Sequence, residues 1–388
     1  MRIGVNAHLL HTGTTYRATG VSNYIRHLLQ GLSAIDPCNA YTVFTGRWAR
    51  HTDCRIILPL GLNFRMVPAL IPTDFPPARI LWEQTVQPVV ARNLDVLHNP
   101  VNVIPIAARV RQVVTIHDLA FLHFRDTHLA VKRLYLTVMT RLSARRARAI
   151  ITDSEFTRQD VIRHLQVPAE KVVPIPLAPD SRFRPLAPSE QHELENFRQR
   201  KGLPERYFLY VGTLEPRKNL PRMLQGYAQC VRQWKTSEDP PYLVLAGPKG
   251  WMFREVFQQA TMLGLEDRVL FPGFIPQEEM IWWINGALAF LYLSAFEGFG
   301  LPPLEAMACG VPVIVNDATA IPEVVGDAGI LVDANSSDAV AQALQAIATQ
   351  ADLRAELRQR SLERAAQFSW HRTAEATLRV YTAVCNQI

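Results

Sequence analysis

The sequence predicts an α/β protein of two domains, each built around a parallel sheet, on three observations. The chain has 388 residues, 48% of them hydrophobic, and this length favours two domains. Short apolar runs alternate with helical periods in two successive series, the pattern of βαβ units. A proline-dense segment near 178–203 separates the two series. We therefore expect one domain over residues 1–180, a linker over 181–203, a second domain over 204–370 and a terminal helix over 371–388.

In the first series, five apolar runs are expected to form strands of one sheet. They span residues 1–9, 41–46, 95–100, 111–118 and 148–154. A helical period covers 21–35, directly after Gly20, and a second one covers 128–149.

Positive charge is concentrated in the first half of the chain. Of a net charge of +6, residues 1–200 carry +10 and residues 201–388 carry −4. Within the expected helix 128–149, basic and apolar residues interleave. This pattern fits a helix on an anionic membrane surface or near an anionic acceptor. It also fits an ordinary surface helix whose apolar face packs on the core.

In the second series, six apolar runs are expected to form the strands of another sheet. They span residues 207–212, 241–247, 268–274, 287–294, 311–315 and 329–333. Pro302 and Pro303 pre-set helical φ angles at the start of a helix that Gly310 and Pro312 end after about two turns.

A strand, a glycine turn and a helix start follow one another around the segment 296–315, FEGFGLPPLEAMACGVPVIV. Helix N-termini bind anions through their amides, and Gly298 and Gly300 lack side chains that would block the approach. Glu297 precedes the helix and Glu305 lies one turn inside it, so both carboxylates can face one ligand. Amides suit phosphate or sugar oxygens and carboxylates suit sugar or ribose hydroxyls, which indicates a nucleotide-sugar site. The alternative is an ordinary strand–turn–helix in which Glu305 complements the helix dipole.

The same segment resembles the donor-binding motif of retaining GT-B glycosyltransferases of family 4, F-E-G-F-G-L-P-x-x-E-A-M-A-x-G-x-P-V, and matches it without a gap. The resemblance implies two Rossmann-like domains facing an interdomain cleft, with the donor held mostly by the second domain and the terminal helix returning to the first. It implies that Glu297 contacts sugar hydroxyls and Glu305 contacts the ribose. The other donor-binding residues that it implies within the motif are Gly298, Phe299, Gly300 and Leu301.

A second candidate loop, GTLEPRKN at residues 212–219, follows an expected strand. Adjacent cations are commonly no more than a solvated turn, but they could also neutralise a departing diphosphate without a metal. The family pattern here is G-R-x-x-x-x-K, which Gly212 and Lys218 match. Thr213 stands at the family's arginine position, so Arg217 is left to supply the second charge. This variant of the loop resembles a subgroup rich in mannosyltransferases of surface-polysaccharide synthesis.

In the first domain, His117 ends the strand 111–118. A histidine there can polarise groups at a reacting carbon, or it can simply be hydrogen-bonded at a strand end. The resemblance places His117 near the donor sugar and Gly20 near the diphosphate. For His98, a purely structural role is favoured.

The segment FPGFIP at 271–276 follows another expected strand. The resemblance assigns recognition of the nucleobase to the backbone of Gly273, Phe274 and Ile275, with no choice between guanine and uracil.

Several classes of protein lose their sequence support. There is no Asp-x-Asp, so the metal-dependent design of sugar transferases is not expected and no metal site is assigned. There is no GxGxxG after the first strand and no GxxxxGK[ST]. The five cysteines are scattered without CxxC, which fits a reduced protein better than a disulfide framework or a zinc site. No apolar run reaches the roughly 18 residues of a membrane span, and the N-terminus does not resemble a signal peptide.

Together these features predict a metal-independent, retaining hexosyltransferase without a cofactor. The expected reaction moves mannose from GDP-mannose to a glycan or lipid-linked acceptor in surface-polysaccharide synthesis. The expected catalytic residues are His117, Glu297, Arg217 and Lys218. Three alternatives stay open, namely another donor such as UDP-glucose, a GT-B sugar epimerase, and a non-catalytic nucleotide-sugar sensor. We expect a cytoplasmic protein, either free or in peripheral contact with the anionic inner face of the plasma membrane, and no nucleic-acid partner.

Overall fold

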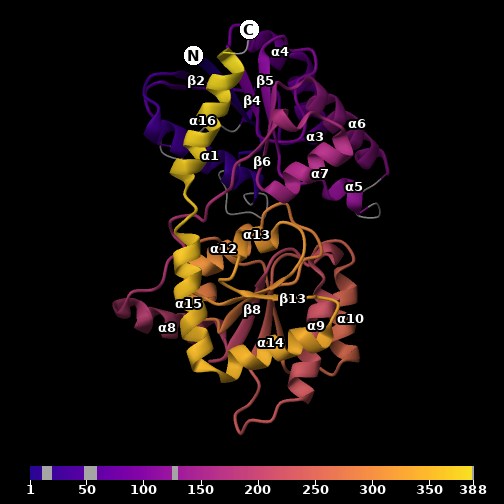
Figure 1. The fold of residues 1–388 in the computed structure, drawn as a ribbon, viewed down its shortest axis with the longest axis vertical. Coiled ribbons are helices and arrows are strands. Elements are labelled where there is room, and N and C mark those ends of the chain that lie inside the picture. Colours follow the sequence, from indigo (N-terminus) through magenta and orange to yellow (C-terminus); the bar gives the residue numbers. More distant parts are fainter. Residues whose placement is uncertain (11–19, 48–58, 125–129, 387–388) are drawn as a thin grey trace. The chain divides into compact units, whose positions relative to one another are not determined.

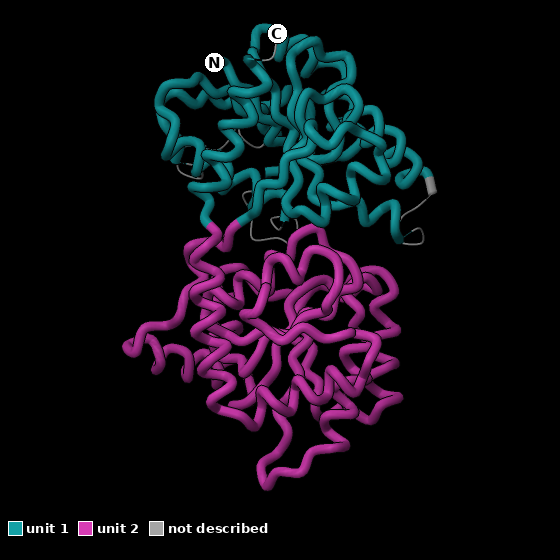
Figure 2. Tube along the Cα trace, viewed as in Figure 1, with its two compact units in different colours: residues 1–177, 369–388 teal, residues 178–368 magenta. Residues whose placement is uncertain are grey.

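The computed structural model describes residues 1–10, 20–47, 59–124 and 130–386. The chain divides into two compact units (Figure 2). Unit 1 comprises Met1–Leu177 together with Ser369–Ile388, and unit 2 comprises Ala178–Phe368. The segment 181–203, expected as a linker, belongs to unit 2 and contains a short 3-10 turn and a helix.

Unit 1 is built on a parallel sheet whose strands, within the described residues, lie in the order β3-β2-β1-β4-β5-β6-β7. The strands are β1 (Arg2–Ala7), β2 (Ala40–Thr45), β3 (Phe64–Pro68), β4 (Val96–Asn99), β5 (Arg111–Ile116), β6 (Ala149–Thr152) and β7 (Val172–Pro174). The five expected strands are all confirmed. The sequence did not predict β3 and β7, because β3 is only partly buried along its length and β7 has three residues. Neither edge strand therefore produces a long buried apolar run.

The helices of unit 1 pack around this sheet (Figure 1). They are α1 (Val21–Ile35), α3 (Pro76–Thr85), α4 (Gln87–Val90), α5 (Ala120–His123), α6 (Ala130–Arg146), α7 (Glu155–Leu165) and α16 (Trp370–Asn386). Helix α1 has the expected bounds, and α6 lies within the expected range 128–149, of which residues 128–129 fall outside the described residues.

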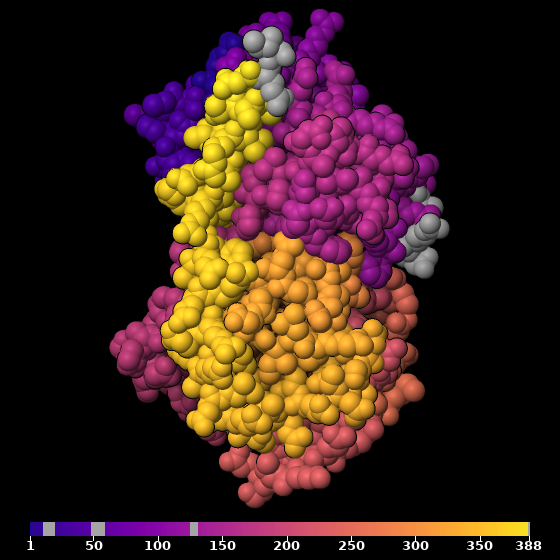
Figure 3. Space-filling model, in the orientation of Figure 1, coloured from indigo at the N-terminus to yellow at the C-terminus, as the bar shows by residue number. Residues whose placement is uncertain are grey.

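The terminal helix α16 is part of unit 1 and lies against α1 (Figures 1 and 3). The close approach is possible because α1 carries Gly31, where a Cβ would lie 2.9 Å from the Cβ of Ala374. Trp370 stacks on His27 with ring centroids 4.8 Å apart. The expected α16 segment thus completes the core of the first unit.

Helix α6 does not pack its apolar stripe on the core. The face turned inward carries small residues, such as the fully buried Thr140, Ser143 and Ala144. The larger apolar side chains are exposed and recur at helical spacing, namely Val131, Leu134, Val138 and Leu142. The interpretation of an ordinary surface helix packed on the core holds for the inward face, where Leu136 and Ala144 contact the core, but the exposed stripe lies outside that contact.

Unit 2 is built on a second parallel sheet, whose strands in the described residues lie in the order β10-β9-β8-β11-β12-β13. The strands are β8 (Tyr207–Val211), β9 (Tyr242–Ala246), β10 (Val269–Gly273), β11 (Ala289–Tyr292), β12 (Val313–Asn316) and β13 (Ile330–Val332). All six coincide with expected strands, because each is a short apolar run bounded by turn residues. Their side chains are largely buried.

Helices cover both faces of the unit 2 sheet, as in doubly wound α/β folds (Figure 1). They are α8 (Gln191–Lys201), α9 (Leu220–Arg232), α10 (Phe253–Met262), α11 (Met280–Asn285), α12 (Leu301–Ala308), α13 (Ile321–Val325), α14 (Ser337–Thr349) and α15 (Ala351–Ala365). Helix α12 is the one expected after the glycine turn. It begins after Gly300, whose φ of 113° favours glycine, and is followed by Gly310 at φ 71°.

No helix in the described ranges has the length and apolar character needed to cross a bilayer.

Candidate functional site

The candidate site of unit 2 lies at the carboxyl ends of β8 and β11, which are hydrogen-bonded neighbours in the sheet. The loop after β8 contains Arg217 and Lys218, and the loop after β11 contains Glu297. Two hydrogen bonds tie the loops together, since the carbonyl of Arg217 accepts from the amide of Ala295 at 2.9 Å and from Ser294 Oγ at 3.1 Å. Parallel strand order thus brings together two segments that are about 80 positions apart.

Glu297 is the centre of this site. Its Oε1 atom lies 2.6 Å from Lys218 Nζ and accepts hydrogen bonds from Ser294 Oγ at 2.6 Å and from the hydroxyl of Tyr292 at 3.0 Å. Burial alone would raise the pKa of Glu297. The charges of Lys218 and Arg217, with these hydrogen bonds, instead lower it to about 2. Glu297 is therefore a carboxylate at neutral pH.

The two oxygens of Glu297 are unequally engaged. Oε1 has three partners, whereas among the described residues Oε2 contacts Arg217 Nη1 alone, at 3.3 Å. A carboxylate oxygen can accept more than one hydrogen bond. Oε2 is thus the oxygen with room to accept a ligand hydroxyl.

Arg217 and Lys218 both contact Glu297. The structure therefore brings the two cations that the sequence singled out to the glutamate of the donor motif. The Arg217 guanidinium also donates to Glu215 at 3.1 and 3.2 Å and to the carbonyl of Phe296 at 3.0 Å. Lys218 is only 7% exposed and donates to the Tyr292 hydroxyl at 2.8 Å. Two carboxylates balance the two cations here, so an anionic ligand would have to compete with Glu215 and Glu297 for them.

Glu305 occupies a different environment. It lies beyond the first turn of α12 and near Asp180, which is itself paired with Arg182 at 3.0 Å. Burial and the negative charge of Asp180 raise the pKa of Glu305 to about 8, against the opposing charge of Arg182. Glu305 is therefore mostly protonated at neutral pH, and as a carboxyl it can both donate and accept a hydrogen bond. This protonation is not visible in the sequence motif.

The remaining motif residues form the turn before α12. Gly298, Phe299 and Gly300 are buried, and the Phe299 ring packs edge-on against Phe368 with centroids 6.0 Å apart. Leu301 is the first residue of α12. The amide of Glu297 donates to Thr319 Oγ1 at 3.3 Å, which fixes the entry to the turn.

Three glycines line the carboxyl ends of β8, β9 and β10. The amide of Gly212 donates to the carbonyl of Ala246 at 3.0 Å, and that of Gly247 donates to the carbonyl of Gly273 at 2.7 Å. Gly247 has φ 144°, and a Cβ there would lie 1.9 Å from the Gly212 carbonyl oxygen. The sequence argument missed Gly247, which directly follows β9 just as Gly212 follows β8.

Other predicted donor residues lie beside these glycines. Thr213 accepts a hydrogen bond from the Tyr210 hydroxyl through its carbonyl at 3.1 Å. Phe274 is 41% exposed and Ile275 is 4% exposed. The Ile275 side chain packs inside the unit, so a ligand at this loop would meet its backbone or the exposed Phe274 ring.

In unit 1, His117 is held by two acceptors. Its Nδ1 lies 2.7 Å from an oxygen of Asp153, and its Nε2 lies 3.1 Å from the carbonyl oxygen of Pro100. Burial lowers the pKa of His117, but the Asp153 charge and both hydrogen bonds outweigh burial and raise it. The pKa of His117 therefore lies above that of an ordinary histidine, and both of its ring nitrogens are engaged.

The sequence argument missed Asp153, which follows β6 beside β5. His117 and Asp153 each directly follow a strand, and β5 and β6 are neighbours in the sheet, so the two strand ends were the signal that could have paired these residues. His98 has the predicted structural role, since it is fully buried between the Tyr381 hydroxyl at 2.6 Å and Thr115 Oγ1 at 2.8 Å. Gly20 precedes α1 with φ 52°. The loop before it, residues 11–19, lies outside the described residues.

Comparison with known proteins places both halves of the chain in one class. Residues 18–182 match the family model "Glycosyltransferase Family 4", and residues 192–364 match "Glycosyl transferases group 1". The structure resembles a sucrose-phosphate synthase from Thermosynechococcus elongatus, with a TM-score of 0.76, 20% identity and coverage of 99% of this chain and 98% of that one. It also resembles Anabaena HepE in complex with UDP and glucose, with a TM-score of 0.75, 19% identity and coverage of 99% and 100%. The fold is that of GT-B glycosyltransferases.

A curated relative is closer in sequence. O-antigen chain mannosyltransferase B of Escherichia coli is 36% identical over 273 residues, which cover 70% of this chain and 70% of that protein. The chain belongs to glycosyltransferase family 4 and is a glycosyltransferase.

Proposed function

We propose that this enzyme transfers mannose from GDP-mannose to a glycan or lipid-linked acceptor in surface-polysaccharide synthesis, with retention of anomeric configuration and without a metal. The donor site is supported by one observation, the largely buried cluster of Lys218, Arg217 and Glu297 at the carboxyl ends of β8 and β11. The preference for mannose rests on the similarity to the 36% identical O-antigen chain mannosyltransferase B of E. coli. Two cations at one loop supply the charge that a bound divalent ion would otherwise provide to a diphosphate.

The chemical step follows from this assignment. The bond between the anomeric carbon and the donor phosphate breaks, and the bond between that carbon and an acceptor hydroxyl oxygen forms on the same face. The departing phosphate oxygen takes the proton of the acceptor hydroxyl. Lys218 and Arg217 stabilise the negative charge that develops on the diphosphate.

Glu297 and Glu305 position the donor. Glu297 Oε2 accepts a sugar hydroxyl, because Oε1 is occupied by Lys218, Ser294 and Tyr292. Glu305 binds the ribose hydroxyls as a protonated carboxyl, and the backbone of Gly273, Phe274 and Ile275 contacts the base. Gly20, Gly212 and the turn at Gly298 supply amides to the phosphates. His117, whose ring nitrogens are engaged, orients the sugar through its main chain.

Donor choice is tested by thermal shift and turnover with GDP-mannose, UDP-glucose, UDP-GlcNAc and the free nucleotides. We expect stabilisation by GDP and GDP-mannose, and slow release of GDP that continues in EDTA. Glu297→Gln keeps the shape of the side chain and should leave GDP binding within a few-fold while reducing turnover about a hundredfold or more, the size of effect seen when one transition-state hydrogen bond is removed. Turnover of UDP-glucose in place of GDP-mannose would refute the donor assignment. Full activity in Glu297→Gln would refute the role of Glu297.

The same experiment separates the other open functions. An epimerase would convert the donor sugar without transferring it to an acceptor, and a sensor would bind the nucleotide without releasing product from the donor. Proton NMR of the product decides the stereochemical outcome, since a product of opposite anomeric configuration would rule out retention.

We further propose that α6 rests on an anionic membrane surface and that the enzyme works at the inner face of the plasma membrane. The exposed apolar residues Val131, Leu134, Val138 and Leu142 share this helix with exposed cations, among them Lys132, Arg141, Arg145 and Arg146. Apolar side chains between cations are typical of helices that lie in the headgroup region.

Sedimentation with phosphatidylglycerol vesicles tests this surface. Binding should weaken as salt rises, because the cations act through a screened field. Leu134→Ser with Val138→Ser should abolish it, whereas Met262→Ser, at an exposed methionine of unit 2, should not. Equal binding by both variants would refute the membrane role of α6.

A further inference from the structure

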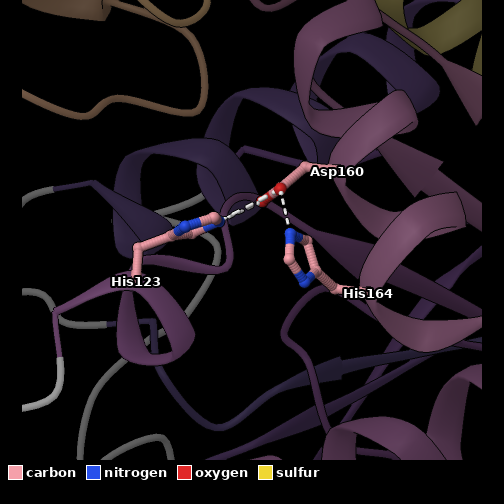
Figure 4. Close-up of side chains that lie close together, drawn as sticks. All are labelled: His123, Asp160 and His164. Atoms are coloured by element: carbon pink, nitrogen blue, oxygen red, sulfur yellow. Dashed lines mark hydrogen bonds and ion pairs between the residues drawn. The ribbon is translucent and has the colours of Figure 1, made fainter.

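Unit 1 contains a group of three potential metal ligands that the proposed transfer reaction does not use. His123 ends the short helix α5, and Asp160 and His164 lie one turn apart on α7 (Figure 4). One ligand atom from each of the three side chains lies within 4.8 Å of the other two. Helices α5 and α7 follow the neighbouring strands β5 and β6, so the sheet order brings the two segments together.

The three side chains converge in the way that metal ligands do. His123 Nε2 lies 2.9 and 3.0 Å from the two oxygens of Asp160, and His164 Nε2 lies 3.3 Å from Asp160 Oδ1. Two ligand atoms bound to one tetrahedral zinc ion at about 2.0–2.1 Å are about 3.3 Å apart. The nitrogen–oxygen distances thus already lie near this value, and the ligand atoms, all within 4.8 Å of one another, need only a closer approach of the two imidazoles to surround an ion.

The burial of Asp160 and the partial exposure of the two histidines favour an ion between them. The Asp160 side chain is only 8% exposed, and among the described residues its carboxylate is paired with the two imidazoles alone. The His123 and His164 side chains are 30% and 39% exposed, so solvent reaches the open side of the group. An ion could enter from that side and keep a water ligand.

We propose that His123, Asp160 and His164 bind a divalent transition-metal ion of the zinc class, in a site separate from the donor-binding residues. Two imidazoles and one carboxylate are the donors that zinc and its neighbours prefer. Magnesium and calcium prefer oxygen ligands and fit poorly. The metal ties α5 to α7, and α5 begins three residues after His117. Its role is to hold this edge of unit 1, not to take part in sugar transfer.

The competing explanation is that Asp160 merely accepts hydrogen bonds from the two rings. That arrangement would bind no zinc at stoichiometric levels. The two explanations differ in a measurable property of the folded chain, which is the binding of one ion through these three residues.

The test uses the full-length chain without a histidine tag, after treatment with a chelator. Zinc affinity is measured by competition with a chromogenic chelator, and cobalt(II) is added separately because tetrahedral cobalt has intense visible bands. The variants are His123→Gln, Asp160→Asn and His164→Gln. The matched control is His371→Gln, because His371 and Glu375 form another i,i+4 histidine–carboxylate pair, in α16, that has no third metal ligand within reach among the described residues.

We expect one zinc ion per wild-type chain, with magnesium giving no competition. Each of the three variants should weaken zinc binding more than about tenfold, since even changes outside the ligand sphere cost roughly 10–100-fold. His371→Gln should bind like wild type. Circular dichroism of each variant checks that weaker zinc binding does not result from unfolding. The visible cobalt bands should disappear in the same three variants. Failure of the wild type to bind zinc, or equal binding by all four variants, would overturn the proposal.

Discussion

Glu305→Gln tests whether the carboxyl on α12 is protonated in the folded protein. The pKa of Glu305 rises from an ordinary value of 4.5 to about 8, first because of burial and then because of the charge of Asp180. A group with a raised pKa binds its proton more tightly in the folded state than in the unfolded state. Stability from this group is therefore fully present below pH 4.5 and is lost as pH rises toward 8.

The magnitude follows from these two values. Between pH 5 and pH 7, the carboxyl group of residue 305 is mostly ionised in the unfolded state but mostly protonated in the folded state. The linkage relation gives a loss of about 2.5 kcal/mol in the free energy of unfolding over that interval. Because Glu305 is not completely shielded from solvent, about 1–2.5 kcal/mol is the expected range. Glutamine cannot ionise, so Glu305→Gln should lose none of this amount.

Urea unfolding of both proteins at pH 5, 6, 7 and 8 measures the difference. The stability of Glu305→Gln relative to wild type should grow with pH, while Glu266→Gln, at an exposed glutamate of the same unit, should follow the wild type. Carboxyl carbon NMR of the folded wild type should show one glutamate that titrates near pH 8. Parallel pH profiles for wild type and Glu305→Gln would refute the reasoning and would leave Glu305 an ordinary carboxylate.

Three further substitutions test the contacts on which the two units depend. Lys218→Met removes one partner of a buried ion pair, so it should cost about 3 kcal/mol in urea unfolding and raise the pKa of Glu297; an unchanged midpoint would contradict the pairing. Asp153→Asn removes the charge that raises the pKa of His117, so nitrogen NMR should show the imidazole titrating at lower pH, and no change would rule out the ion pair. Gly247→Ala should cost about 3 kcal/mol in thermal or urea unfolding, because alanine would combine an unfavourable φ of 144° with a clash against a backbone carbonyl; wild-type stability would show that the turn relaxes.

The sequence by itself determined most of the sheet framework and the position of the donor motif. Apolar runs bounded by glycine, proline and polar turn residues are local signals, and they located all six strands of unit 2 and five strands of unit 1. The helix after the Gly298–Gly300 turn was also readable, because proline and glycine restrict the backbone at known helix positions. The edge strands β3 and β7 were not predicted, because an edge strand need not be a long run of buried apolar residues.

Only the tertiary structure decided which side chains act together. Lys218 meets Glu297 because β8 and β11 are adjacent in the sheet, although the residues are 79 positions apart. The same dependence on strand order pairs His117 with Asp153 and brings His123 to the α7 residues. Burial then sets charge, since Glu297 next to two cations is ionised while Glu305 near Asp180 holds its proton. Local sequence patterns carry no information on these distances, because pairing and burial arise only when remote segments pack together.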